Sequence, residues 1–190
     1  MELFLITVTT VALAEIGDRS MFLAALFGIR CRRLWPIFWG MTAGLFVNQA
    51  LSAVVGVWLF DFLDADWHNW VLGIAFLIMA IWVLFPEDDD QDVDAECART
   101  LFFTAAVTFF LFEMADKTQL AVLALAGVSG DWLVVSLGAT LGILLLTGPA
   151  LWLGRRFADR IPMHILRYVA SALFALVGLW SLAVAIGWVG

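Results

Sequence analysis

The chain has 190 residues, 64% of which are hydrophobic, and its mean hydropathy is +0.99. A soluble domain is only about half apolar, so this composition indicates a membrane protein whose main partner is the lipid bilayer. The net charge of −7 and the isoelectric point near 4.6 argue against a nucleic acid as a partner.

Six apolar segments are long enough to cross a bilayer, which takes about 20 residues of α-helix. Tryptophans near many of the segment ends are typical of the membrane–water interface. We therefore predict an all-α membrane protein with six transmembrane helices. These run over Leu3–Phe27, Trp35–Phe60, Trp67–Phe85, Thr100–Ala126, Trp132–Leu153 and Met163–Trp188.

Basic residues alternate from one connection to the next. The first, third and fifth connections carry or adjoin arginines, whereas the second and fourth carry neither lysine nor arginine. The positive-inside rule predicts that the arginine-bearing connections are cytoplasmic and that both termini lie outside the cytoplasm. Residues 86–99 form an acidic cytoplasmic linker, with a cation-concentrating funnel as the functional alternative. Cys31 and Cys97 lie in the first and third connections, and we expect unpaired thiols.

The two halves of the sequence match at a constant offset of 98 residues. Glu15-Ile16-Gly17-Asp18-Arg19-Ser20 aligns with Glu113-Met114-Ala115-Asp116-Lys117-Thr118, and the same offset pairs Gly40 with Gly138. The chain is therefore predicted to be one integrated transmembrane domain made of two three-helix repeats, residues 1–85 and 100–190. Because three is odd, the second repeat must enter the membrane from the opposite side, which gives inverted repeats.

Each repeat places a glutamate and an aspartate near the middle of its first helix. An ionised carboxylate costs several kcal/mol at that depth, so such residues are functional candidates. Positions i and i+3 share a face of a continuous helix, and the inverted repeat brings the two acid pairs together. Carboxylate oxygens suit Mg²⁺, Ca²⁺ and Mn²⁺, and protons could replace the metal when it leaves. The predicted metal ligands are Glu15, Asp18, Glu113 and Asp116.

Each acid pair is followed by a base that could form a purely structural ion pair with the glutamate four residues earlier. Two acids and one base still leave a negative charge in each half, so we expect the bases to tune the acids or to line an aqueous path. Other nearby polar side chains could supply neutral oxygens, or could simply join helices by hydrogen bonds. The supporting and charge-tuning candidates are Arg19, Ser20, Asn48, Gln49, Lys117, Thr118, Gln119 and Thr147.

The duplicated Glu-x-Gly-Asp-[Lys/Arg]-[Ser/Thr] pattern resembles the GDT1 family, also called UPF0016, over the whole chain. The resemblance implies a cation/proton exchanger that handles Mn²⁺ or Ca²⁺, and a manganese exporter for a short bacterial member. Carried over by position, it implies that the same four acids bind the metal. Ala115 departs from the pattern, and it favours continuous helix where Gly17 allows an unwound backbone.

Our leading hypothesis is a secondary transporter of the bacterial inner membrane that exports Mn²⁺ in exchange for H⁺. We expect no prosthetic group, since the metal is the transported substrate. The same ligands could serve a Ca²⁺/H⁺ antiporter. A small amino-acid exporter would instead use Arg19 or Lys117 to bind a substrate carboxylate. An intramembrane enzyme is disfavoured, because no nucleophile, metal-binding histidine or phosphate-binding loop accompanies the acids.

Overall fold

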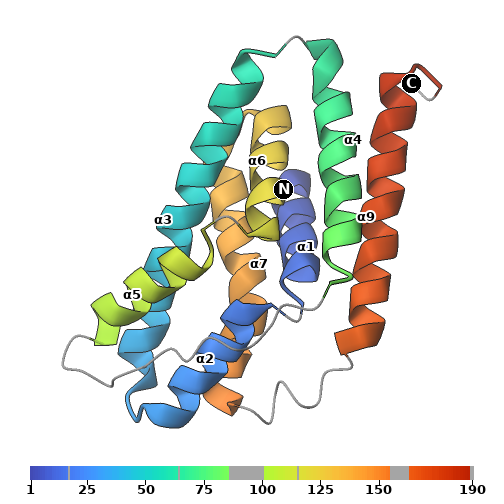
Figure 1. The fold of residues 1–190 in the computed structure, drawn as a ribbon. Coiled ribbons are helices and arrows are strands. Elements are labelled where there is room, and N and C mark those ends of the chain that lie inside the picture. Colours follow the sequence, from blue (N-terminus) through green and yellow to red (C-terminus); the bar gives the residue numbers. More distant parts are fainter. Residues whose placement is uncertain (17, 64, 86–100, 115, 155–162, 189–190) are drawn as a thin grey trace.

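The computed structural model describes residues 1–16, 18–63, 65–85, 101–114, 116–154 and 163–188, and within these ranges every regular element is a helix (Figure 1). The all-α prediction is therefore confirmed for this part of the chain. The acidic linker at 86–99, with Cys97, lies outside the described residues. The helices are α1 (Glu2–Glu15), α2 (Arg19–Arg30), α3 (Leu34–Asp61), α4 (Ala65–Trp82), α5 (Leu101–Phe112), α6 (Lys117–Ser129), α7 (Trp132–Leu153) and α9 (Met163–Ala185).

Two of the six predicted helices are wrong, because each is broken at its charged motif. The predicted first helix is α1 followed by α2, and the predicted fourth helix is α5 followed by α6. The residues before α2 and α6 have extended backbones, with ψ of 160° at Asp18 and 164° at Asp116. Aspartate favours this position, since it is among the best residues for capping a helix N-terminus and a poor one within a helix. Ala115 itself lies outside the described residues, and the second break is defined by the end of α5 at Phe112 and the start of α6 at Lys117.

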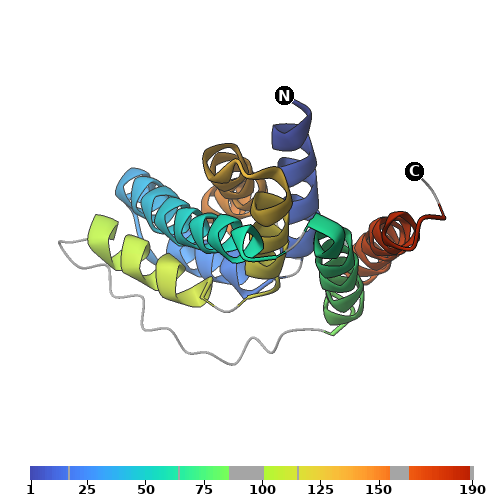
Figure 2. The same cartoon turned by 90° about the horizontal axis from the view of Figure 1, so that it is seen from above.

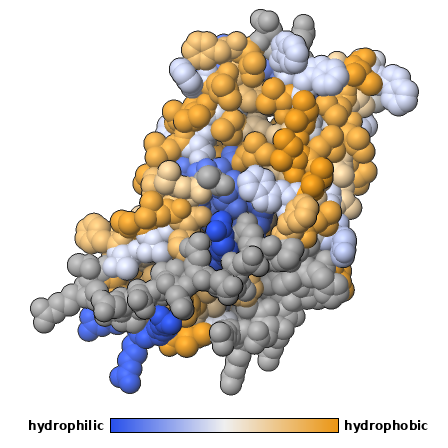
Figure 3. Space-filling view, viewed as in Figure 1, coloured by the Kyte–Doolittle hydropathy of each residue, from blue (hydrophilic) through white to orange (hydrophobic). Residues whose placement is uncertain are grey.

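Three of the described helices are long and apolar enough to cross a membrane by length and composition. They are Leu34–Asp61, Trp132–Leu153 and the part of α9 from Tyr168 to Ala185. Hydrophobic residues cover most of the described surface in Figure 3, and hydrophilic residues gather around mid-height between hydrophobic flanks. On this face, the hydrophilic residues at mid-height thus lie among hydrophobic ones, and a second hydrophilic group lies at the lower left.

The chain direction of the second half opposes that of the first. In Figure 1, α1, α2 and α4 run downward while α3 runs upward; α5, α6 and α9 run upward while α7 runs downward. The α3–α4 and α6–α7 connections therefore lie at one end, and the arginine-bearing α2–α3 connection lies at the other. Each helix of the second half thus runs opposite to its counterpart in the first half.

The long helix of each half packs on the broken helix of the other half. A Cβ added to Gly40 or Gly44 of α3 would lie 2.1 Å from the carbonyl oxygen of Phe102 or Ala106 in α5. Gly142 of α7 approaches Val8 of α1 in the same way, with a distance of 2.8 Å. The α3–α5 and α7–α1 contacts are related by the offset of 98, so glycine lets the two halves interlock through equivalent surfaces.

The last helices of the two halves, α4 and α9, pack on each other beside the remaining helices (Figure 2). Phe76 and Phe174, which are equivalent under the repeat, meet edge to face with ring centroids 5.9 Å apart. Gly73 and Gly178 allow the same pair of helices to approach closely. Equivalent residues therefore contact one another where the halves meet.

Cys31 follows α2 and is buried and disulfide-bonded, which corrects the expectation of an unpaired thiol at this position. The expectation rested on the spacing of the two cysteines, which resembles no metal or redox motif, although their number alone allows a disulfide.

Candidate metal centre

The four predicted acids lie at the two helix breaks rather than on continuous helices. Glu15 is the last residue of α1, and Asp18 caps the N-terminus of α2. Glu113 directly follows α5, and Asp116 occupies the capping position of α6. The expectation that each pair shares one helical face is therefore wrong, because an extended backbone separates the acids. The breaks still turn both motifs toward a common interior.

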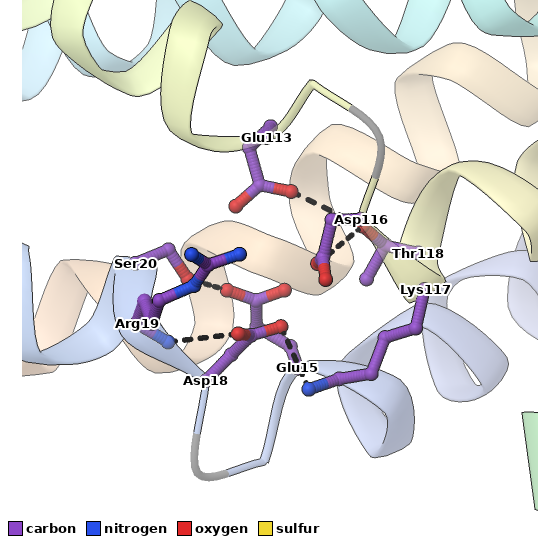
Figure 4. A network of polar contacts seen from close by, with 8 residues as sticks. All are labelled: Glu15, Asp18, Arg19, Ser20, Glu113, Asp116, Lys117 and Thr118. Carbon is purple, nitrogen blue, oxygen red and sulfur yellow. Dashed lines mark hydrogen bonds and ion pairs between the residues drawn. The ribbon is translucent and has the colours of Figure 1, made fainter. Parts of the chain in front are cut away.

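Three of the acids converge closely enough to hold one metal ion. Glu15, Glu113 and Asp116 each offer a carboxylate oxygen, and these three atoms lie within 4.8 Å of one another. The three residues are 0%, 1% and 6% exposed. Figure 4 shows their side chains pointing toward one another from different helices. Glu15 Oε2 and Asp116 Oδ1 have no hydrogen-bond partner among the described residues, so acceptor oxygens remain for a ligand.

Hydroxyl groups orient the two glutamates. The Ser20 hydroxyl donates to Glu15 Oε1. Thr118 is its repeat equivalent and lies 3.1 Å from Glu113 Oε2 and 3.2 Å from Asp116 Oδ2. Both hydroxyls are buried, and each comes from the helix that begins after its own motif. They position carboxylates, which fits their prediction as supporting residues.

Asp18 is held differently from Asp116. Its Oδ1 accepts a hydrogen bond of 2.8 Å from the backbone amide of Arg19, and its Oδ2 lies 2.9 Å from the Lys117 ammonium. Lys117 thus forms an ion pair with the first motif, across the two halves, which the expected local pairing with Glu113 did not include (Figure 4). Arg19 begins α2 and is partly exposed, whereas Lys117 is 4% exposed.

The amide residues of α3 lie beside the second break. The Asn48 side-chain amide donates a hydrogen bond of 2.8 Å to the carbonyl of Phe110. Its oxygen accepts a hydrogen bond of 2.8 Å from the side chain of Gln119. Gln49 is completely buried, and neither of its amide atoms has a hydrogen-bond partner among the described residues. Thr147, the repeat equivalent of Gln49, is buried and donates to the Ile143 carbonyl of its own helix. The structure thus ties Asn48 and Gln119 to the motif region and leaves Gln49 as an open donor and acceptor.

Sequence reasoning missed two features of this centre. It did not predict the bond between Asn48 and Gln119, which joins the two halves. It also did not predict that Lys117 pairs with the opposite motif. Aspartate as a preferred N-cap was a usable signal for the helix breaks, whereas the partner of Lys117 depends on how the repeats interlock and has no local signature.

Chemically, the centre is an oxygen-donor site for a hard cation. Its three converging ligands are carboxylates, and the described part of the chain brings no histidine or cysteine into this group. The four acids and the two bases of the motifs together carry two net negative charges when all are ionised. A divalent cation would match that charge. Burial makes such a match important, since an uncompensated charge is costly away from water.

Comparison with known proteins agrees with this chemistry. The family model described as "Divalent cation/proton antiporter GDT1" matches residues 3–91 and 101–187. A protein of Vibrio cholerae serotype O1 named "Putative manganese exporter" is 38% identical over 94% of this chain and 90% of its own length. The GDT1 antiporter of Saccharomyces cerevisiae is 25% identical over 93% of this chain and 81% of its own. No solved structure matches the chain. The resemblance inferred from the two motifs is thus confirmed, and the chain belongs to the GDT1 family of divalent cation/proton antiporters.

Proposed function

We propose that this protein exports Mn²⁺ from the cytoplasm in exchange for H⁺. The observation that carries the proposal is the convergence of three buried carboxylates, Glu15, Glu113 and Asp116, within 4.8 Å. Like charges this close, and removed from water, need neutralisation by a cation or by protons. One site can therefore hold a metal and protons alternately, which is the minimum that an exchanger needs.

The arrangement that we propose in the membrane is six crossings in two inverted repeats, 1–85 and 100–190, joined by the linker at 86–99. The opposed chain directions of the two halves support it (Figure 1). Each broken helix then counts as one crossing, with its break and its acids near mid-membrane. Broken helices at a repeat interface are a recurrent way for transporters to build a substrate site.

We place the chain in a bacterial inner membrane with both termini outside the cytoplasm, on the basis of the loop arginines. A reporter fused after Gly190 that is active only outside the cytoplasm tests this orientation. Strong activity is expected. Activity confined to a cytoplasmic reporter at the same position would reverse the proposed orientation and with it the direction of export.

Within the site, we assign metal binding to Glu15, Glu113, Asp116 and Asp18. Ser20 and Thr118 keep the glutamates oriented through their hydroxyls. Gln49 is a further candidate for a neutral ligand, because its buried amide oxygen has no partner among the described residues. Asn48 and Gln119 brace the second break.

The choice of Mn²⁺ over Ca²⁺ rests on the name of the Vibrio cholerae relative. A site made of oxygen donors also suits Ca²⁺, so a Ca²⁺/H⁺ antiporter is the second candidate. The family match favours a metal over an amino acid as substrate. Competition separates the two ions: excess Ca²⁺ should leave Mn²⁺ uptake by reconstituted protein largely intact if Mn²⁺ is the cargo.

The decisive experiment is Mn²⁺ transport in proteoliposomes with and without an imposed pH gradient. Carboxylates bind a metal only when deprotonated, so metal affinity should fall as pH falls, and binding should release protons. A pH gradient that drives protons across the membrane in the direction opposite to Mn²⁺ should accelerate Mn²⁺ transport several-fold. Transport that ignores the gradient would remove proton coupling from the proposal while leaving metal transport in place.

A further inference from the structure

The Lys117 side chain connects the two motifs. It begins α6 in the second half, yet its ammonium lies 2.9 Å from Asp18 Oδ2 in the first half. Both side chains are nearly inaccessible, at 5% and 3% exposure. Figure 4 shows the lysine reaching toward Asp18 from the side opposite to Glu113. The pair therefore lies inside the protein and bridges the repeats.

This ion pair divides the four acids into two classes. Glu15, Glu113 and Asp116 form the group with metal-ligand spacing, whereas Asp18 is outside that group and lies 2.9 Å from the Lys117 ammonium. The sequence gives Asp18 and Asp116 equivalent positions, so the difference arises from tertiary contacts. A buried lysine near a cation site is costly unless it has an anionic partner, and a compact ammonium on a flexible stem can change partners.

We propose that Lys117 is an internal counter-cation that competes with the transported metal for Asp18. Without metal, the ammonium holds Asp18 away from the other three acids. When a divalent cation enters, it draws Asp18 in as a fourth carboxylate ligand and displaces the ammonium. This inference rests on the proposed metal site and adds a residue that sets its affinity.

The exchange has a functional use. Four unopposed carboxylates would hold a divalent ion so tightly that release would be slow, since each added anionic ligand raises affinity. A lysine that recaptures Asp18 lowers the affinity and assists release. Removing the ammonium should therefore make binding tighter and transport slower, a combination that simple damage to the site does not produce.

The test is Lys117→Met, which keeps most of the side-chain length and removes the charge. In the full chain reconstituted in lipid nanodiscs, Mn²⁺ affinity at fixed pH should rise at least about tenfold, given the size of one short-range charge interaction. Transport turnover in proteoliposomes should fall. Arg19→Met is the matched control at the equivalent, partly exposed position, and its effect on affinity should be smaller. Unchanged or weaker Mn²⁺ binding by Lys117→Met would overturn the proposal.

A second comparison asks whether the lysine acts through Asp18. Lys117→Met should raise affinity several-fold more in the wild-type background than in an Asp18→Asn background, because only the former regains a ligand. An equal rise in both backgrounds would mean that Lys117 acts merely as a nearby charge, and the proposed exchange would be wrong.

Lys117→Arg covers the case in which Lys117→Met does not fold. The guanidinium can bind Asp18 through two hydrogen bonds, so it should be harder to displace, and Mn²⁺ should bind several-fold more weakly. Equal affinity would count against the competition. Wild-type protein that binds no Mn²⁺ or Ca²⁺ would instead refute the proposed function, so the two failures are distinguishable.

Discussion

The two charged motifs have nearly the same sequence but different surroundings. In the second motif, Asp116 is one of the converging carboxylates and accepts a hydrogen bond from the Thr118 hydroxyl. In the first, Asp18 is engaged by the Arg19 amide and by the Lys117 ammonium. The difference shows that a duplicated motif yields an asymmetric site once each copy packs against elements that have diverged.

The polar contacts beyond the motifs have diverged as well. Asn48 and Gln119 form a hydrogen bond across the halves, while their repeat equivalents, Leu146 and Met21, are apolar. The glycine contacts occur at both of the positions that the repeat relates, whereas the hydrogen bond between side chains occurs at only one of them. Backbone packing thus keeps the symmetry of the duplication, and side-chain chemistry departs from it.

The largest effect is expected where the halves agree. Glu15→Gln and Glu113→Gln each keep the side-chain shape but remove one charged ligand and one titrating group. Each should reduce Mn²⁺ transport by roughly a hundredfold or more, because a hydrogen-bonded, buried charge is replaced by a neutral amide. Proteoliposome flux measures this, with the exposed Glu2→Gln as a control that should transport normally. Full transport by the double variant would eliminate the carboxylate site.

The next comparison sets Asp116 against Asp18. Asp116→Asn removes a member of the converging group and should weaken Mn²⁺ binding about tenfold or more. Asp18→Asn should cost less, because wild-type Asp18 must first leave Lys117. Isothermal titration on purified variants gives both affinities, with exposed Asp61→Asn as the control. If Asp18→Asn weakens Mn²⁺ binding more than Asp116→Asn does, the different surroundings of Asp18 and Asp116 do not govern metal affinity.

The hydroxyls offer a smaller contrast. Thr118 contacts two carboxylates, whereas the hydrogen bond from Ser20 goes to Glu15. Thr118→Val, which keeps the shape, should therefore weaken Mn²⁺ binding several-fold, because only part of the roughly 1.5–3 kcal/mol that a hydrogen bond to a charged group contributes passes on to metal binding. Ser20→Ala should have about half that effect in free energy. Titration of the two variants side by side decides, and identical losses would show that the second contact of Thr118 is immaterial.

The smallest effect concerns stability. Asn48→Leu leaves the Gln119 amide and the Phe110 carbonyl without this partner and should lower thermal stability by the equivalent of about 1–3 kcal/mol. Adding Gln119→Met reproduces the apolar pair at the equivalent position, Leu146 and Met21, and should recover much of the loss. Thermal unfolding in detergent reports both variants. If the double variant loses more stability than the two single variants together, the Asn48–Gln119 pair contributes more than the hydrogen bond between its own members.

The all-α character of the fold could be predicted from the sequence, because apolar length is a property of whole segments. The acids of the centre were also identified, since a carboxylate in an apolar segment is conspicuous. The helix breaks were not, because a single capping aspartate competes with a long apolar run that favours continuous helix. The pairing of Lys117 with Asp18 joins residues about a hundred positions apart in sequence and depends on the interlocked packing of the halves.

The contacts of Gly40 and Gly44 also bear on biosynthesis. The α3 surface that they form is complete as soon as residue 61 has been synthesised, but its partner α5 ends only at Phe112. At ordinary rates of translation the ribosome needs roughly 2–10 s to cover that interval. During this time the glycine surface faces lipid or the insertion machinery. The glycine surface of α3 therefore stays without its α5 partner until the second half of the chain has been synthesised.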